Sequence, residues 1–588
     1  MKYFKKDSNK GKLICLLCSH YCSIKKDQVG ICGINKNTGD EIDCLVYGHI
    51  AAMNIDPIEK KPLYHFYPQS QSLSLGTVGC NFKCTFCQNW GISQEKKINK
   101  EKFFAPIDIV NLALKHKCKS ISYTYNEPTI FYPYAKDIAL EAKKYDIKSV
   151  YVSNGFESSE VASDMIGIID AINVDLKCFT NEYYKKLGGS LDILLKNLKF
   201  FAKADIHLEI TTLLVPSKND SKEEIYKIAK FIKDELGDEI PWHLSAFHPD
   251  YKELDLPRTS KESLLSAKKI GEDLGLKHVY IGNAGLDNHT RCTKCNKVLI
   301  HRVYFNTLEN TLDNDSCSCS KKLEGVFMTK RKMTVAGTFY PEEKSEILRY
   351  IEHFNQGFTY KKLLNNIKAL IVPHAGYIYS GFTANIAYYL SSYQKYKTLI
   401  IIGPSHKISF EGASVCSYDT YETPLGNIEI NKTFIKELQN EFSYLYFNKN
   451  AHAEHSTETQ APFIKHYFPN ASLIEIVYGK LSAKELSILF EKLLNKDDVL
   501  LVISTDLSHF HSQEESNIID KHCVQALISQ NLEALEKSEA CGMTGLKALL
   551  LAEKNKNLKN IELHSCTSAK VTKDETRVVA YTSFIVGD

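Results

Sequence analysis

Two blocks of alternating strand-like and helix-like segments constrain the fold more than any other feature of the sequence. In residues 71–284, short apolar runs such as "SLSLGTVG", "SVYVSNG" and "AINVDLK" alternate with segments in which apolar residues recur every three or four positions. From residue 333 the alternation restarts, with runs such as "TLIIIGPSH" and "VLLVISTDLSH". Such alternation is typical of βα units around a parallel sheet. The sequence therefore predicts two α/β domains, with functional side chains where strands end.

Cysteine-rich segments flank the first block on both sides and divide the chain further. We predict an N-terminal module over residues 1–65, a domain over 66–288, a small module with its linker over 289–327, and a second domain over 328–588. A chain of 588 residues suits several domains, because one domain usually holds about 100–200 residues.

Composition excludes some classes of function and favours a reducing compartment. Lys and Arg number 73 against 70 Asp and Glu, so the net charge gives no case for binding nucleic acid or a membrane surface. No apolar run approaches the roughly 18 residues of a membrane span, and the N-terminus does not have the pattern of a signal peptide. We expect a cytoplasmic protein. In that compartment, the clustered members of its eighteen cysteines are more typical of metal sites than of disulfides.

Three cysteines, Cys80, Cys84 and Cys87, lie in the loop "GTVGCNFKCTFCQNW" directly after a strand-like run. Three thiolates can ligate three corners of a cubane 4Fe–4S cluster and leave one iron open for a small molecule. The alternatives are three unrelated cysteines or an incomplete zinc site, since zinc usually takes four ligands.

This stretch resembles the radical S-adenosylmethionine (SAM) superfamily. The resemblance is closest to the pyruvate formate-lyase activating enzyme branch and, with the cysteine-rich ends, to the radical SAM component of the AmmeMemoRadiSam system. It implies a partial (β/α) barrel and a 4Fe–4S cluster whose open iron chelates SAM. It also implies reductive cleavage of SAM to a 5′-deoxyadenosyl radical, with an electron donor such as flavodoxin or ferredoxin.

The same resemblance assigns SAM-binding roles to polar residues at other strand ends. Glu127, with Asn126, would hold the SAM amino group, while Asp175 and Lys177 would bind a ribose hydroxyl and the carboxylate. Each of these residues has a structural alternative, because a polar residue after a strand often caps the next helix. The full set of expected SAM contacts is Asn126, Glu127, Ser153, Asn154, Asp175, Lys177 and His243.

Two further groups of four cysteines lie in the flanking modules. The C-terminal group resembles a zinc ribbon with one shortened knuckle, and we expect it to hold a structural metal, zinc or an iron–sulfur centre. For the N-terminal group, a metal site and surface thiols both remain open. The groups are Cys15, Cys18, Cys22 and Cys32, and Cys292, Cys295, Cys317 and Cys319.

Histidines take over from cysteines in the second half. His374 and His406 both follow apolar runs, and Asp506 with His509 closes "VLLVISTDLSH" in the same way. Cys541 precedes an expected helix, whose dipole would favour its thiolate. Imidazoles, a carboxylate and a thiolate together can bind a transition metal. The alternative is that each histidine is a core or capping residue.

Residues 333–588 resemble the Memo family, whose fold is similar to that of the class III extradiol dioxygenases. The resemblance implies an iron or copper site at His374, His406 and Cys541, with Asp506 and His509 as a further ligand or as acid–base groups. Ring-opening activity is not implied, because the dioxygenase ligands are two histidines and a glutamate. A rival interpretation is a metal-free pocket in which Cys541 is a nucleophile. Three more residues are expected in the same cleft, His452 and His455 with Glu458 as their partner.

The two resemblances together predict a fusion enzyme. In the first hypothesis, the radical SAM domain modifies a small-molecule or protein substrate on which the Memo-like domain performs a metal-dependent step. In the second, the radical domain is an activase that generates a radical on a partner protein, and the Memo-like domain is a binding module. An AMMECR-like protein is a possible partner under either hypothesis. The sequence does not name the substrate.

Overall fold

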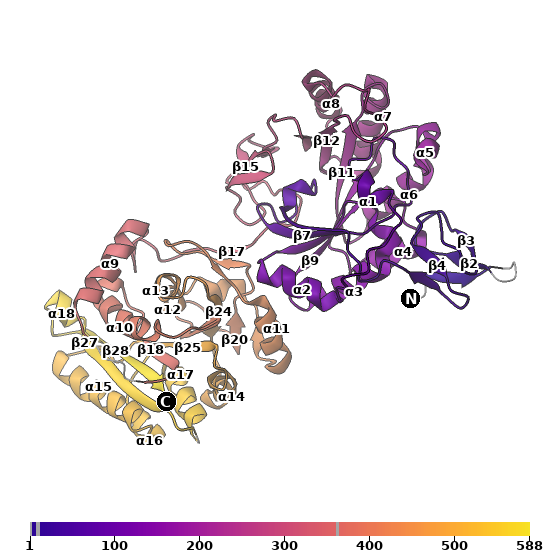
Figure 1. The fold of residues 1–588 in the computed structure, drawn as a ribbon. Helices are drawn as coiled ribbons and strands as arrows, with labels where there is room; N and C mark the ends of the chain where they lie inside the picture. Colours follow the sequence, from indigo (N-terminus) through magenta and orange to yellow (C-terminus); the bar gives the residue numbers. More distant parts are fainter. Residues whose placement is uncertain (1–2, 8–11, 360–363, 555) are drawn as a thin grey trace. The chain divides into compact units, whose positions relative to one another are not determined.

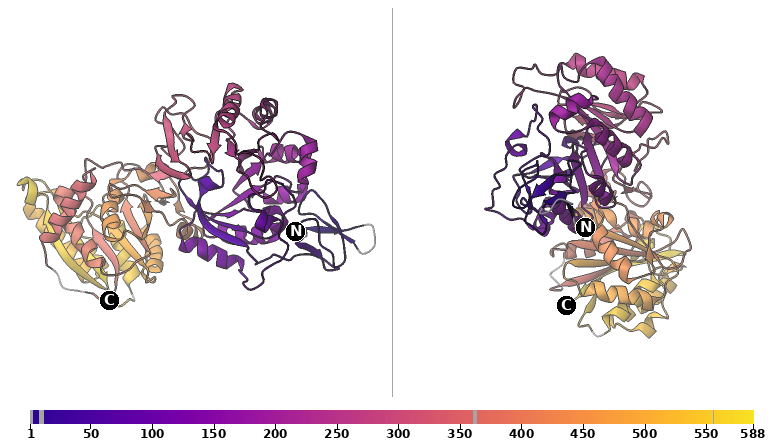
Figure 2. Two further views of the ribbon diagram at one scale, coloured as in Figure 1. Left: turned by 45° about the horizontal axis from the view of Figure 1, so that its top comes forward. Right: turned by 90° about the vertical axis from the view of Figure 1, so that its right-hand side faces the viewer.

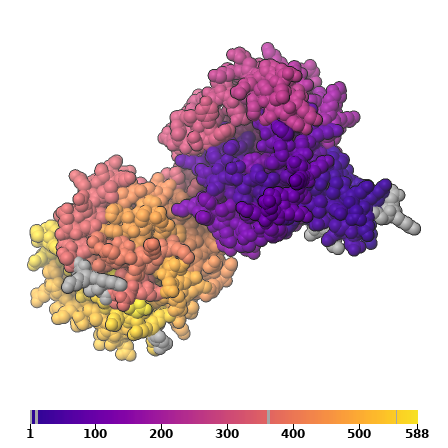
Figure 3. Space-filling view, in the orientation of Figure 1, coloured from indigo at the N-terminus to yellow at the C-terminus, as the bar shows by residue number. Residues whose placement is uncertain are grey.

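The structure is a computed structural model that describes residues 1–588 except 1–2, 8–11, 360–363 and 555. The chain forms two compact units, Met1–Met328 and Thr329–Asp588. Their buried apolar side chains form separate cores. In Figure 3 the two units are told apart by colour, indigo to pink for the first and coral to yellow for the second.

The first unit is built on an eight-stranded sheet in which strands follow one another in chain order (Figure 1). Strands β7 to β13 are parallel, and β6 pairs antiparallel with β7 at one edge. The sheet path ends at β13 and β6, so the barrel is partial, as expected. The strands are β6 (Ala52–Pro57), β7 (Gln71–Gly76), β8 (Ser120–Tyr123), β9 (Lys148–Ser153), β10 (Ala171–Asp175), β11 (His207–Leu214), β12 (Trp242–Ala246) and β13 (Val279–Gly282).

Helices connect these strands (Figure 2), and apolar residues of helices and strands share one core. Ser158, Ser221 and Ser260 cap α4, α7 and α8, each accepting a backbone N–H from the first turn. The α-helices are α1 (Trp90–Ser93), α2 (Pro106–Lys115), α3 (Tyr132–Lys143), α4 (Ser159–Met165), α5 (Asn181–Leu187), α6 (Leu191–Phe201), α7 (Lys222–Phe231) and α8 (Lys261–Asp273). Shorter helices are η1 (Ile58–Lys60), η2 (Pro128–Phe131) and η3 (Ile232–Leu236).

Two small modules complete the first unit. Arg302 fastens the C-terminal one to the barrel, because its buried guanidinium donates to the Tyr64 carbonyl (2.7 Å) and lies over the Tyr64 ring. The N-terminal module has β1 (Phe4–Lys6), β2 (Lys12–Cys15), β3 (Ser23–Lys25), β4 (Asn35–Asn37) and β5 (Ile42–Cys44). The C-terminal module has β14 (Thr290–Arg291), β15 (Val298–Val303) and β16 (Asn306–Asn310).

The second unit has a nine-stranded mixed sheet at its centre. Strands β24, β19, β25 and β18 are adjacent and parallel, whereas β20 and β28 flank them antiparallel. The strands of this unit are β17 (Lys330–Arg331), β18 (Ile367–Val372), β19 (Thr398–Pro404), β20 (Ala413–Val415), β21 (Thr420–Tyr421), β22 (Ile428–Glu429), β23 (Leu445–Tyr446), β24 (Ser472–Tyr478), β25 (Val499–Ser504), β26 (His509–His511), β27 (Lys559–Thr567) and β28 (Val578–Gly587).

The helices of the second unit cover this sheet and share one apolar core with it. They are α9 (Lys344–Gln356), η4 (Tyr377–Gly381), α10 (Phe382–Ser391), α11 (Lys432–Glu441), η5 (Lys449–His452), α12 (His455–Glu458), α13 (Ala461–Tyr467), α14 (Ala483–Leu494), α15 (Gln513–Ile528), α16 (Leu532–Leu535), α17 (Met543–Glu553) and α18 (Ala569–Thr572). Within the described parts of the chain, no helix combines the length and the apolar character that crossing a bilayer requires.

Candidate functional site

The first site is a cavity of about 240 Å³ where the parallel strands of the barrel end. The loop after β7 brings Cys80, Cys84 and Cys87 to its wall. Among the described residues, the sulfurs of these three cysteines do not all lie within 4.8 Å of one another. A cluster carries its thiolates on separate irons, so wider spacing suits a cluster better than a single ion.

Asn126 holds the cysteine loop in place. Its side-chain amide donates to the carbonyl of Gly79 (2.8 Å) and to the hydroxyl of Thr77 (3.0 Å), and its oxygen accepts from the Thr77 backbone N–H. These contacts use the polar atoms of Asn126 within the protein. Asn126 lines the cavity, but its contacts are those of a residue that positions the loop.

Glu127 is buried and accepts from four donors. The Thr129 backbone and hydroxyl and the Ser153 hydroxyl bind one carboxylate oxygen, and the Asn154 N–H binds the other at 2.7 Å. Burial raises the pKa of Glu127, and these hydrogen bonds act against the rise. The predicted residues Glu127, Ser153 and Asn154 therefore form one connected wall of the cavity.

A second buried carboxylate, Glu157, stands behind this wall and was missed from the sequence. Its side chain accepts from Ser153 and Thr129, while its other oxygen has no partner in the described part of the chain. Burial and the neighbouring charge of Glu127 raise the pKa of Glu157 to about 7. The sequence signal was an acidic residue just after the predicted contacts, in "SNGFE".

Lys177 and Asp175 bring a charged pair to the same cavity, with a Nζ–Oδ2 distance of 2.7 Å. Burial alone would lower the pKa of Lys177, but Asp175 and Cys84 hold it above its usual value. Burial raises the pKa of Cys84 to about 11, and Lys177 acts in the opposite direction. An ammonium beside a cysteine thiol favours the thiolate that an iron ligand must supply.

His243 is the one expected SAM contact that does not line the cavity. It pairs in register with Thr211 and binds Glu209 through Nε2 at 2.6 Å, packed edge-on against Tyr64. Two residues further along β12, on the same face of the strand, Ser245 lines the cavity instead. The predicted strand and face therefore reach the cavity, but His243 itself lies one layer below it.

Thr211 supplies a test of whether the cavity suits a polar ligand. It lines the cavity, and its buried hydroxyl has no hydrogen-bond partner among the described residues. A buried hydroxyl without a partner costs free energy, and a bound polar molecule would remove that cost. Three thiols, a charged pair and a free hydroxyl in one cavity therefore fit an iron–sulfur cluster together with SAM.

The second site lies where β18, β19 and β25 end. His374 follows β18 and His406 follows β19, and the donor nitrogens of His374, His406 and His455 all lie within 4.8 Å of one another. Parallel neighbours end at the same edge of a sheet, which brings the first two histidines together. His455, the first residue of α12, completes the group.

Cys541 lies beside this group, with its Sγ 3.3 Å from His374 Nε2 and 3.1 Å from the Asp506 backbone nitrogen, which donates to it. Asp506 also accepts from the His374 backbone at 2.8 Å. Burial raises the pKa of Cys541 to about 12, so the helix dipole does not dominate as expected. His509 lies 2.8 Å through Nδ1 from the Leu507 carbonyl, and among the described residues no contact joins it to the three histidines.

Glu454 orients two of the three imidazoles. One oxygen lies 3.1 Å from His406 Nδ1 and 2.8 Å from His455 Nδ1, and the other accepts the His406 backbone N–H. Burial alone would raise the pKa of Glu454, but these contacts hold it well below its usual range. With Nδ1 engaged, Nε2 of each ring is left to bind a metal. Sequence analysis missed Glu454, although it stands between two histidines in "AHAEHSTE".

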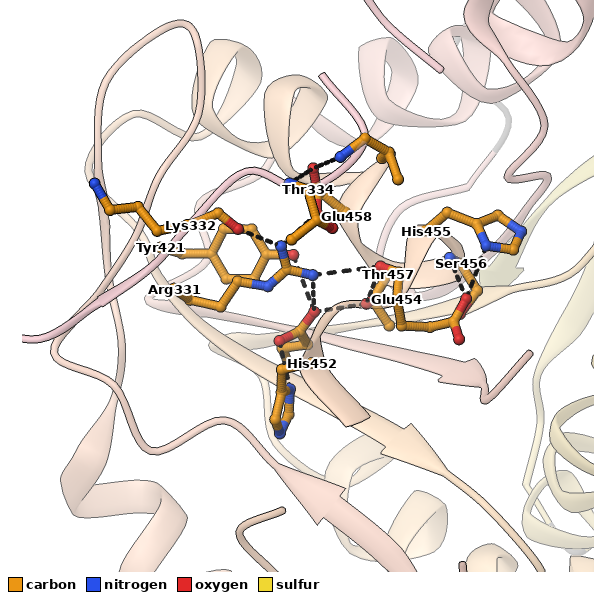
Figure 4. A network of polar contacts seen from close by, with 12 residues as sticks. Arg331, Lys332, Thr334, Tyr421, His452, Glu454, His455, Ser456, Thr457 and Glu458 are labelled. Carbon is orange, nitrogen blue, oxygen red and sulfur yellow. Dashed lines mark hydrogen bonds and ion pairs between the residues drawn. The ribbon is translucent and has the colours of Figure 1, made fainter. Parts of the chain in front are cut away.

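Two expectations for this cleft are corrected. His452 is buried elsewhere, with Nδ1 2.7 Å from Glu475 and Nε2 2.8 Å from the Ser414 hydroxyl. Glu458 does not contact a histidine but forms a buried ion pair with Arg331. His452 ends η5 before a turn, so its ring lies on the far side of that turn from His455 (Figure 4).

Arg331 is the centre of this buried network (Figure 4). Besides Glu458 it contacts Glu475 (3.4 Å) and the Glu454 carbonyl, and it lies over the Tyr421 ring. Cys416, His452 and Glu475 also form a compact donor group, but the arginine already supplies the positive charge there. The network therefore anchors the segment that carries Glu454 and His455.

Comparison with known proteins agrees with this division. A family model described as the radical SAM superfamily matches residues 74–232, and one described as Memo-like protein matches residues 331–585. A MEMO1 family protein of Aquifex aeolicus is 32% identical over 274 residues, which cover 44% of this chain and 99% of the relative.

The chain belongs to the MEMO1 family through its second unit and carries a radical SAM domain in its first. Radical SAM domains are enzymes, so this member of the MEMO1 family is a fusion enzyme. An uncharacterised protein of Methanocaldococcus jannaschii is 39% identical over 322 residues, covering 54% of this chain and 96% of the relative. A domain of a pyruvate formate-lyase-activating enzyme from Bacteroides vulgatus is 19% identical and covers 28% of this chain and 98% of its own, with a TM-score of 0.25. No conclusion about activity rests on a score of that size.

Proposed function

We propose that the first unit binds a 4Fe–4S cluster through Cys80, Cys84 and Cys87 and binds SAM in the same cavity. The observation that carries the proposal is that these three thiols share one cavity with Asp175, Lys177 and other polar strand ends. When bound, the cluster and SAM supply a 5′-deoxyadenosyl radical by one-electron reduction. An external donor of the flavodoxin or ferredoxin class provides that electron.

The protein's own residues bind and orient the cofactor in this proposal. The Lys177 ammonium attracts the SAM carboxylate, and Asp175 beside it accepts from a ribose hydroxyl. The free hydroxyl of Thr211 gives the ligand a further polar partner. Glu127 acts through the backbone N–H of Asn154 and the Ser153 hydroxyl, which keep this wall of the cavity in place.

The test is the amount of 5′-deoxyadenosine formed by reduced, anaerobically reconstituted protein. A Cys84→Ala variant should form none above background, whereas Cys178→Ala, which removes another buried thiol, should stay within about twofold of the original. A Thr211→Val variant should keep its cluster absorbance and bind SAM more weakly. Full cleavage by Cys84→Ala would refute the proposed cluster.

For the second unit we propose a site for iron or copper at His374, His406, His455 and Cys541. Three imidazoles and a thiolate suit either metal, and Glu454 leaves the correct ring nitrogens available. Asp506 and His509 are the candidate acid–base groups. A His406→Ala variant should lose bound metal, measured by elemental analysis after anaerobic loading. Unchanged metal content would favour the rival pocket, in which Cys541 is a nucleophile.

The substrate decides between two functions for the whole chain. In the enzyme hypothesis, a small molecule or protein is modified by the radical and then processed at the metal site. In the activase hypothesis, the radical is left on a partner protein, for which an AMMECR-like protein of the AmmeMemoRadiSam system is the candidate. A partner-centred radical seen by electron paramagnetic resonance favours the second, and a metabolite that changes only with active protein favours the first. A cytoplasmic location is part of both proposals.

A further inference from the structure

The N-terminal module contains a second set of clustered thiols outside both sites. Cys15, Cys18, Cys22 and Cys32 line one small enclosed pocket, together with Asn35 and four other residues of the module and with Ile130 of the barrel. All four are free thiols, and three of them are buried. The four come from the end of β2, the loop that follows it and the turn before β4. All three segments are needed to bring the four thiols together.

Hydrogen-bond donors surround the sulfurs of this pocket. The backbones of Leu17, His20 and Ile31 hydrogen-bond to the thiols of Cys15, Cys18 and Cys22 respectively. The Asn35 amide nitrogen lies 3.4 Å from Cys32 Sγ and donates to it. Donors aimed at all four sulfurs are typical of thiolates that ligate a metal, because they spread the negative charge.

The pocket supplies hydrogen-bond donors to sulfur but no counter-charge. No lysine or arginine is among the described residues that line it, so four thiolates there would need a bound cation. A metal centre would supply that charge and give the surrounding N–H donors their charged acceptor.

The spacing of the sulfurs distinguishes a cluster from a single ion. In the C-terminal module, Cys292 Sγ is 3.5 Å from Cys319 Sγ, and all four sulfurs there lie within 4.8 Å of one another. Among the described residues, the N-terminal four do not form such a compact group. Wider spacing around a common pocket suits four thiolates on four different irons.

The pocket adjoins the cysteine loop of the barrel. His20, which lines it, lies 3.1 Å through Nε2 from the carbonyl of Asn81, and a Cβ at Gly79 would be only 2.8 Å from the Cys32 carbonyl. Gly79 has a φ of +88°, so both backbone strain and this close approach require glycine. The two groups of thiols are thus separated by only a few residues of packed backbone.

We propose that Cys15, Cys18, Cys22 and Cys32 bind an auxiliary 4Fe–4S cluster next to the radical SAM cavity. The site is a binding site in its own right and does not depend on the proposed activity. All four corners of this cluster have protein ligands, so it has no open iron for SAM. With four protein ligands, this cluster would stay bound beside the Cys80 loop of the proposed catalytic centre.

Iron content of the full chain tests the proposal. After anaerobic reconstitution with ferrous iron and sulfide, we expect about eight cluster irons and about eight acid-labile sulfides per chain, beside any single iron held by the second unit, and about four of each in a Cys80→Ala, Cys84→Ala, Cys87→Ala variant. A Cys15→Ser, Cys18→Ser variant should also hold about four and should still cleave SAM if its fold is intact by circular dichroism. Cys44→Ser, a buried thiol of the same module, should keep all eight.

The triple variant keeps the test decisive even if the N-terminal variant fails to fold. About four irons in the triple variant, with the Mössbauer signature of a cubane cluster, support the proposal whether or not the protein cleaves SAM. A triple variant with no acid-labile sulfide and no cubane Mössbauer signal overturns it, whatever single iron the second unit holds. One equivalent of zinc that is lost in Cys15→Ser, Cys18→Ser protein also overturns it, because the site would then hold a single ion.

Discussion

Glu454 binds two imidazoles with one carboxylate, so its loss should affect metal binding more than folding. In a Glu454→Gln variant, an NH2 group that cannot accept replaces one oxygen, so either both imidazoles or the His406 backbone N–H lose their acceptor. Removal of such a carboxylate typically costs about 10–100-fold in metal affinity. Competition with a chelator, followed by elemental analysis of iron and copper, measures this loss.

The matched control for that experiment is Glu411→Gln. Glu411 is exposed and pairs with Lys480 on the surface, so it loses the same charge without touching the histidines. Metal affinity should stay at the original value in the control. Equal affinities in the two variants would show that Glu454 does not position the ligands.

Glu553 should make the second unit less stable as pH rises. It is buried, with Asn560 and Gln530 donating to one oxygen and no described partner for the other. Burial raises its pKa to about 7 from an ordinary value near 4.5. The folded state therefore holds a proton that the unfolded state releases above pH 4.5, so stability falls as pH rises from about 4.5 to 7 and then levels off.

A Glu553→Gln variant removes that dependence. The shift corresponds to on the order of 3 kcal/mol, so the variant should gain stability over the original protein at pH 8 but not at pH 4. Urea unfolding at the two pH values measures the difference. A gain that is equal at both pH values would assign the effect to packing instead of ionisation.

The sequence predicted part of the second site at this scale. His374 and His406 were found because each follows a strand, and strand ends are visible as the ends of apolar runs. His452 and His455 could not be told apart, because the two residues between them form the turn that decides which ring faces Glu475 and which faces His374. Glu454 has no periodic signal at all, since it caps a helix of only four residues.

At the scale of elements, the β14–β16 ribbon depends on its cysteines more than on apolar packing. Its buried apolar group is small, and Cys292 and Cys317 are themselves members of it. A Cys292→Ser, Cys295→Ser variant should lose one equivalent of zinc per chain, because two of four ligands cannot hold the ion. Elemental analysis measures the zinc. A Cys118→Ser control, with its thiol buried under the barrel sheet, should keep it.

An unchanged zinc content in the double variant would leave these four cysteines without a metal.

The order of the barrel strands was predictable from the alternation alone, because each βα unit adds its strand beside the last. The depth of a residue inside the barrel was not predictable. His243 and Ser245 point to the same face of β12, and only the way Glu209 and Tyr64 fill the interior decides which of them meets the cavity.

At the scale of the whole molecule, the second unit should be much less stable on its own when Arg331 is replaced. A fragment of residues 329–588 keeps the arginine, and an Arg331→Met variant of it leaves Glu458 and Glu475 buried without a cation. Breaking a buried pair in this way costs about 3–5 kcal/mol. Urea unfolding of both fragments measures the difference.

Lys332→Met is the control, since Lys332 pairs with Glu422 nearer the surface, where such pairs contribute about 1 kcal/mol or less. Equal stability of the Arg331 and Lys332 variants would contradict the role of the buried network.

The restart of alternation near residue 333 predicted the second α/β domain from sequence. It could not reveal that the domain begins with a buried charge, because "MTKRKMT" has the composition of a solvated linker.

That charge limits where two genes could have been joined to make this chain. The MEMO1 family protein of Aquifex aeolicus is matched over 99% of its own length by 44% of this chain. The Memo part therefore also exists as a separate protein. A recombination point downstream of Arg331 would have removed the counter-charge of Glu458 and Glu475 in one step. A join between Met328 and Arg331 keeps Arg331 in the same parent gene as Glu458 and Glu475. Fusion of this unit to other proteins should likewise succeed if the join lies upstream of Arg331.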